Sequence, residues 1–157
     1  MIYCIFKDDY ENFMPTNETI VNKFHLEKLG IKCLKRSEFY QNQINKITKE
    51  DHVINWVGFD SEEQMDLFDS IPAKKYLKNI DTCSSKRIPF EKDRKALDKI
   101  KFDAILLTYC TEENINLLKS WGHNVISYPH LLDYSQVYSS AKQIDVLISG
   151  QMSHYDS

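Results

Sequence analysis

The sequence is poor in glycine, and its four glycines do not form a phosphate-binding motif. Neither the G-x-G-x-x-G fingerprint of dinucleotide-binding loops nor the G-x-x-x-x-G-K-[ST] P-loop occurs. The first apolar segment, residues 2–6, runs directly into Lys7, Asp8 and Asp9 without a glycine. Because a backbone wraps closely round a pyrophosphate only where side chains are missing, this first loop is not predicted to bind NAD or ATP.

Other motifs of catalysis and metal binding are missing as well. The four cysteines contain no C-x-x-C pair, and the five histidines show no ligand spacing, so no metal site is expected. A G-x-S-x-G nucleophile elbow is also lacking, which argues against an α/β-hydrolase. Most of the cysteines lie in or beside apolar segments, and this placement predicts buried, reduced thiols.

Net charge and hydropathy limit the classes of partner that the protein is expected to bind and the cellular compartment in which it is expected to lie. Twenty basic residues against 23 acidic ones give a net charge of −3, so no nucleic-acid partner is expected. No apolar run approaches the roughly 20 residues of a membrane span, and residues 104–107, for example, form a run of strand length. Acidic residues follow the first apolar segment at once, which is not the pattern of a secretory signal. We therefore expect a cytoplasmic protein with no transmembrane segment.

What the sequence does contain is a regular alternation of strand-like and helix-like segments. Apolar residues make up 42% of the chain, enough for a core. Short apolar segments predict strands, and the intervening segments have helical spacing with capping residues such as Ser61 and Thr111. Such alternation predicts an α/β fold: a Rossmann-like, mainly parallel sheet with helices on both faces. The expected strands are residues 2–6, 31–34, 53–57, 76–80, 102–109, 125–128 and 144–149.

Polar residues that follow these strands are the candidates for function, because ligands of parallel sheets bind at the carboxyl ends of the strands. Asp8, after the first strand, and Asp60, after the third, are candidate catalytic carboxylates. His130, after the sixth, is a candidate general base or hydroxyl ligand. Each also has an ordinary structural interpretation: a solvated loop for Asp8, the start of a helix for Asp60 and a strand-end turn for His130.

The last third of the chain carries a more specific pattern. A strand at 102–108 is followed by a helix ending in Trp121-Gly122, then by Val125-Ile126-Ser127-Tyr128-Pro129-His130, a polar connector and Ile144-Asp145-Val146-Leu147-Ile148-Ser149-Gly150. This pattern resembles the end of the first domain of two-Rossmann-domain (GT-B) glycosyltransferases. There a proline-containing turn and a linker precede the first strand of the second domain.

The resemblance implies where the chain divides into domains and which ligand each domain binds. Residues 1–132 would form the acceptor-side domain, 133–143 the linker and 144–157 the first strand and loop of a second domain that otherwise lies outside this sequence. The first domain would bind a small-molecule or glycan acceptor, and the second a nucleotide-sugar donor. Ser149 and Gly150 would approach the donor diphosphate, and His130 would face the cleft between the domains. This sequence by itself would bind no cofactor and would not be active as a transferase.

Two other interpretations remain open from the residues. In the first, 144–149 is one more strand of a complete flavodoxin-like or receiver-like module, with Asp8, Asp9 and Asp60 as an acidic cluster. A receiver also needs a lysine soon after the strand at 102–108, but the next lysine in the chain is Lys119. In the second, the chain is the front domain of an ATP-dependent ligase, which has a similar order of elements.

Overall fold

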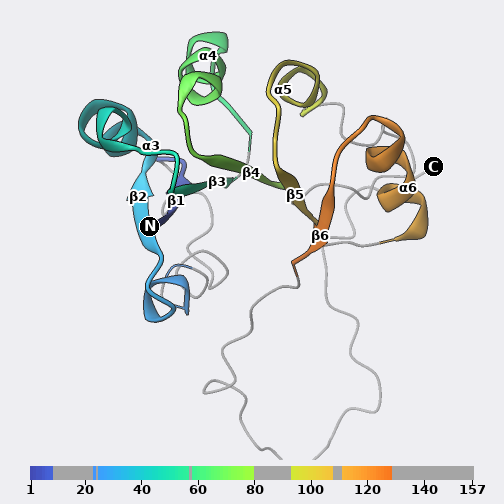
Figure 1. Ribbon diagram of the computed structural model, residues 1–157, viewed down its shortest axis with the longest axis horizontal. Coiled ribbons are helices and arrows are strands. Elements are labelled where there is room, and N and C mark those ends of the chain that lie inside the picture. The colour runs from blue at the N-terminus through green and yellow to red at the C-terminus, as the bar shows by residue number, and fades with distance from the viewer. Residues whose placement is uncertain (9–22, 24, 57, 80–92, 108–110, 129–157) are drawn as a thin grey trace, which may run out of the picture.

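The computed structural model describes residues 1–8, 23, 25–56, 58–79, 93–107 and 111–128 of the 157-residue chain. Within these residues, six strands form one sheet in the order β2-β1-β3-β4-β5-β6, and every neighbouring pair is parallel (Figure 1). The predicted α/β fold with a Rossmann-like parallel sheet is therefore confirmed. The strands are β1 (Ile2–Phe6), β2 (Lys32–Lys35), β3 (His52–Trp56), β4 (Lys74–Asn79), β5 (Ala104–Leu107) and β6 (Val125–Ser127).

The direction of each connection determines which face of the sheet its helix covers. From β3 onward the chain adds strands in one direction through α4 (Glu62–Ser70), α5 (Arg94–Lys99) and α6 (Glu112–Ser120). Right-handed crossovers place these helices on a single face, where Figure 1 shows them. The step from β1 to β2 runs the opposite way, so the helical turn at residues 25–28 lies on the other face.

The larger core lies on the face covered by α4, α5 and α6. Alternate residues of the strands point to this face, as the period of a pleated strand requires, and they meet apolar residues of the helices. The Phe68 ring of α4 is fully buried and lies 5.3 Å from the Phe59 ring and 6.2 Å from the Phe102 ring. The strand residues of this core are Tyr3, Ile5, Leu34, Val53, Leu77, Ile105 and Leu107.

A smaller cluster occupies the opposite face. Cys4, Phe6 and Trp56 are buried there under Leu26 of the helical turn. The ammonium of Lys78, in β4, is also buried and lies 4.7 Å from the centre of the Trp56 ring. The sheet is thus covered on both faces, as the apolar strands predict.

Element boundaries agree with the sequence to within a few residues, with one irregular segment. The segment between the second and third strands, where the alternation predicts a helix, is instead a succession of α3 (Arg36–Glu38), a π-helical segment (Phe39–Gln43) and a 3-10 turn (Ile44–Lys46). No side-chain cap hydrogen bond stabilises the start of any of the three. Both predicted caps are confirmed, since Ser61 accepts a hydrogen bond from the amide of Gln64 and Thr111 one from that of Asn114.

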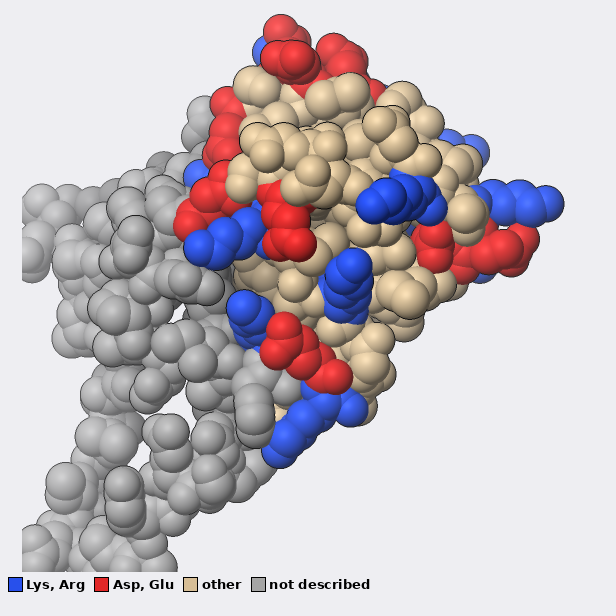
Figure 2. Space-filling view, turned by 90° about the vertical axis from the view of Figure 1, so that its left-hand side faces the viewer, with Lys and Arg blue, Asp and Glu red and all other residues tan. Residues whose placement is uncertain are grey.

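Two surface properties bear on partners. No helix among the described residues is long and apolar enough to cross a membrane. On the side of the molecule that carries β2 and α3, acidic and basic side chains are interspersed, and the basic ones drawn in colour do not gather into a patch (Figure 2). The expected linker at 133–143 and strand at 144–149 lie outside the described residues.

Candidate functional site

The candidate site lies at the carboxyl ends of β1 and β3. These strands are neighbours, but the connections that leave them run to opposite faces of the sheet. In open parallel sheets this reversal opens a crevice in which ligands bind. Lys7 and Asp8 follow β1, and the loop 58–61 joins β3 to α4. The strand order therefore brings Asp8 and Asp60 to the same edge of the sheet, although they lie far apart in the sequence.

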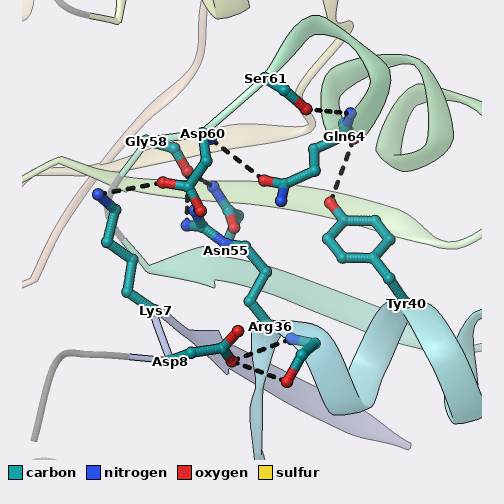
Figure 3. A network of polar contacts seen from close by, with 10 residues as sticks. Lys7, Asp8, Arg36, Tyr40, Asn55, Gly58, Asp60, Ser61 and Gln64 are labelled. Atoms are coloured by element: carbon teal, nitrogen blue, oxygen red, sulfur yellow. Dashed lines mark hydrogen bonds and ion pairs between the residues drawn. The ribbon is translucent and has the colours of Figure 1, made fainter.

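Arg36 is the central residue of this edge. It follows β2, and its side chain reaches past the end of β1 to the loop after β3 (Figure 3). Its Nη1 donates to Oδ2 of Asp60 at 2.6 Å, and its Nη2 donates to the carbonyl of Gly58 at 2.8 Å. Arg36 is only 1% exposed. A buried guanidinium with its two ends bound to one loop fixes the position of that loop.

Further contacts hold the same loop from the β3 side. Asn55, fully buried in β3, donates from Nδ2 to the Gly58 carbonyl at 2.6 Å. Gly58 has a φ of +49°, a left-handed conformation that glycine adopts without strain. The Asp60 amide donates to Oε1 of Gln64 at 3.1 Å, and the hydroxyl of Tyr40 donates to the Gln64 carbonyl at 3.2 Å. The start of α4 is thus a rigid part of the site.

Asp60 is an ionised carboxylate whose negative charge is balanced by two cations. Besides Arg36 it pairs with Lys7, whose Nζ lies 3.1 Å from Oδ1, while its own side chain is 47% exposed. Burial alone would raise the pKa of Asp60, but hydrogen bonds and charges from Arg36 and Lys7 outweigh burial and lower that pKa. A carboxylate held by two cations is a weak base. It retains the ability to accept hydrogen bonds from a ligand on its exposed side.

Asp8 has a different environment. Successive side chains of an extended chain point to opposite sides, so Asp8 turns away from Lys7 and Asp60 toward α3 (Figure 3). Its Oδ1 accepts hydrogen bonds from the amide and from the hydroxyl of Ser37, both at 3.0 Å. Asp8 is exposed, and no ion pair to it is present among the described residues. It is therefore a positioned carboxylate in contact with solvent.

A pocket of about 330 Å³ adjoins Asp60. It lies between the start of α4 and the start of α5, at the same edge of the sheet. Lys95 and Glu62, which line it, form an ion pair at 2.7 Å. Its other lining residues combine an apolar floor with polar groups: Phe59, Asp60, Ser61, Met65, Asp93 and Ala96. Carboxylates beside an aromatic ring suit a neutral, hydroxyl-bearing ligand better than an anion.

The sequence predicted the two carboxylates of this edge but not the two cations that pair with Asp60. Arg36 was not a candidate, although its position directly after a strand placed it at the carboxyl edge. Asn55 was noticeable as the polar residue of an otherwise apolar strand. His130, Ser149 and Gly150 lie outside the described residues. In the described part of the chain, no three residues among His, Cys, Asp and Glu are grouped to hold a metal ion.

Comparisons of the chain with protein-family models, with curated proteins and with solved structures give no match. The function is therefore argued from the fold and from this site.

Proposed function

We propose that this chain is the acceptor-binding part of a glycosyltransferase that transfers a sugar from a nucleotide-sugar donor. The observation that carries the proposal is the group of polar residues at the β1–β3 crevice, where Asp60 pairs with Lys7 and Arg36 and the exposed Asp8 lies nearby, bound to Ser37. Such a site suits an acceptor with several hydroxyl groups, because carboxylates accept hydrogen bonds from hydroxyls and the cations donate to them.

The resemblance in the last third of the chain supports the same proposal. The part of that pattern that falls in the described residues folds as β5, α6 and β6, with β6 at the edge of the sheet. All strands are parallel, so the carboxyl end of β6 lies at the same end of the sheet as the candidate site, which is formed at the carboxyl ends of β1 and β3. That arrangement suits a donor domain that closes over the acceptor.

The two carboxylates receive different roles in this proposal. Asp8 is the candidate general base, since it is exposed and is oriented by Ser37 through a single oxygen. Asp60 positions the acceptor instead, because its ion pairs with Arg36 and Lys7 lower its basicity. On the resemblance alone, we also place His130 at the cleft between the domains. On the same ground, Ser149 and Gly150 are proposed to lie near the donor diphosphate.

One observation favours a second function. The order β2-β1-β3-β4-β5 is that of flavodoxin-like domains, which include receivers. A receiver, however, holds Mg²⁺ on a cluster of carboxylates at this edge, whereas Asp60 is bound to two cations. We therefore rank a receiver-like or flavin-binding module second.

Ligand titrations followed by amide NMR test the proposal. Sugars, oligosaccharides and polyols are added to the chain, with nucleotide-sugars, flavin mononucleotide and Mg²⁺ with acetyl phosphate as separate series. An acceptor is expected to shift the amides of Lys7, Asp8, Ser37 and Asp60. Shifts at this edge with flavin or with the phosphodonor, and none with any hydroxylated ligand, would establish the second function instead.

Matched variants then test the role of Asp8 in the product of the complete gene. Asp8→Asn is expected to lower kcat for sugar transfer by about 10²–10⁴-fold, the usual contribution of a general base. Glu50→Gln is the control, because Glu50 is an exposed carboxylate in the loop before β3, at the opposite edge. Equal activity of the two variants would remove Asp8 from the mechanism.

A further inference from the structure

Two cysteines lie side by side in the sheet, on the face opposite α4. Cys4 of β1 and Cys33 of β2 are direct partners in the register of these neighbouring parallel strands. Partners in a parallel pair point to the same face, and neighbouring strands are about 4.8 Å apart. Both cysteines are free thiols, and they pack in the same apolar cluster.

The two thiols are unequal. Cys4 is 0% exposed, whereas Cys33 is only partly buried, at the rim of the cluster. Burial raises the pKa of the Cys4 thiol well above its usual value. The adjacent Cys4 side chain lowers the pKa of Cys33, against the effect of its own burial. Cys33 is therefore the more accessible and the more acidic of the two thiols.

We propose that Cys33 and Cys4 form a thiol-modification site, in which Cys33 reacts with a low-molecular-weight disulfide and Cys4 resolves the adduct. In the first step the Cys33 thiolate attacks one sulfur of the disulfide, forms a mixed disulfide and releases one thiolate. In the second, Cys4 loses its proton and attacks the Cys33 sulfur, which expels the other thiolate. The two cysteines are oxidised to a Cys4–Cys33 disulfide, and the small disulfide is reduced to two thiols.

The surroundings favour the second step over a stable adduct. Cys33 lies against the segment that covers this face, since its thiol contacts the carbonyl of Lys23 at 3.9 Å. A bulky group on Cys33 must push that segment aside, whereas the bond to Cys4 needs no added volume. The strand spacing falls within the Cα separations of about 4.4–6.8 Å that disulfides accept, but near the lower limit. The bond is therefore expected to be readily reduced.

Oxidised glutathione tests the site on the full chain. The starting protein carries Cys83→Ser and Cys110→Ser, so that Cys4 and Cys33 are its remaining thiols. Intact mass and peptide mapping are expected to show the loss of both thiol hydrogens and a link between the peptides of Cys4 and Cys33. Adding Cys4→Ala should trap one glutathionyl group on Cys33. Adding Cys33→Ser should slow the reaction with glutathione by about tenfold or more, because only a buried thiol remains.

The unmutated chain provides a readout that does not depend on the folding of any variant. After the same treatment its peptide map is expected to contain the Cys4–Cys33 link, and dithiothreitol should remove it. A link from Cys33 to Cys83 or Cys110 would overturn the proposal. So would two free thiols after treatment, or a glutathionyl adduct that persists on Cys33 while Cys4 is present.

Discussion

Removing Asp60 should destabilise the protein more than removing Arg36, although both changes break the same ion pair. Arg36 is buried and Asp60 is about half exposed. In Asp60→Asn the guanidinium loses a negative charge that it contacts at 2.6 Å. In Arg36→Met the side-chain stem keeps its packing, and Asp60 retains Lys7 and water as partners.

The magnitudes follow from this difference in exposure. Breaking a fully buried ion pair by removing one partner costs about 3–5 kcal/mol. Water reaches the exposed side of Asp60, so we expect about 2 kcal/mol for Asp60→Asn. Arg36→Met removes hydrogen bonds from two acceptors that keep other partners, since the Gly58 carbonyl still accepts from Asn55. For that variant we expect about 1 kcal/mol.

Urea unfolding measures both values, with fluorescence of the buried Trp56 and circular dichroism as probes. The double variant Arg36→Met/Asp60→Asn should be about as stable as Arg36→Met alone, because no buried cation is left to lose its counter-charge. Lys7→Met is the control and should cost less than about 1 kcal/mol, as an exposed pair does. Additive losses in the double variant, or a larger loss for Arg36→Met than for Asp60→Asn, would refute this reasoning.

Four further substitutions test the helix caps, the core and the contact of the amino terminus. Ser61→Ala and Thr111→Ala each remove a helix cap and should each cost about 1 kcal/mol in urea unfolding; no loss in either would mean that the cap hydrogen bonds are not stabilising. Phe68→Ala opens a cavity among aromatic rings in the core and should lower the free energy of unfolding by about 3–5 kcal/mol. In a chain that starts at Met1, hydrogen bonds from the amino terminus and from Thr48 lower the pKa of Asp51 to about 2. Its carboxylate therefore stabilises the fold above the ordinary pKa of 3.8, and this contribution is lost as pH falls toward 2. The stability gap between the wild type and Asp51→Asn should shrink accordingly in urea unfolding at successive pH values, and a constant gap would contradict the assignment.

The fold was predicted well because its buried strands consist largely of apolar residues. All four residues of β5 are buried, and such a continuous apolar segment is typical of a strand covered on both faces. The second strand was harder to predict, since β2 lies at the edge of the sheet and only Leu34 among its four residues is buried. The irregular helical segment after it could not be predicted, because Arg36 and Phe39 are held there by tertiary contacts rather than by caps.

Prediction of the site was less complete, for a physical reason. The position of Asp8 and Asp60 after strands was enough to place both at one edge. Asp8 and Asp60 occupy different environments because of the strand order. This order lets Arg36, which follows β2, reach past β1 to the loop after β3. Local sequence does not encode this order, since it results from the packing of all the connections. A charged residue directly after an edge strand is the signal that could have identified Arg36.

The register of β1 against β2 positions two pairs of residues: the thiols Cys4 and Cys33, and the cations Lys7 and Arg36. Cys4 faces Cys33, and Phe6 faces Lys35, so Lys7 and Arg36 follow at the next matching position of the two chains. Each cation lies three residues beyond its cysteine, directly after the end of the strand. A bond between the thiols would therefore alter the spacing of β1 and β2 directly beneath the two groups that hold Asp60. If oxidation changes the spacing of these strands, amide shifts should appear at Lys7, Arg36 and Asp60 as well as at the cysteines. Shifts confined to the cysteines and the turn at 25–28 would mean that the sheet absorbs the change and that the two pairs are independent.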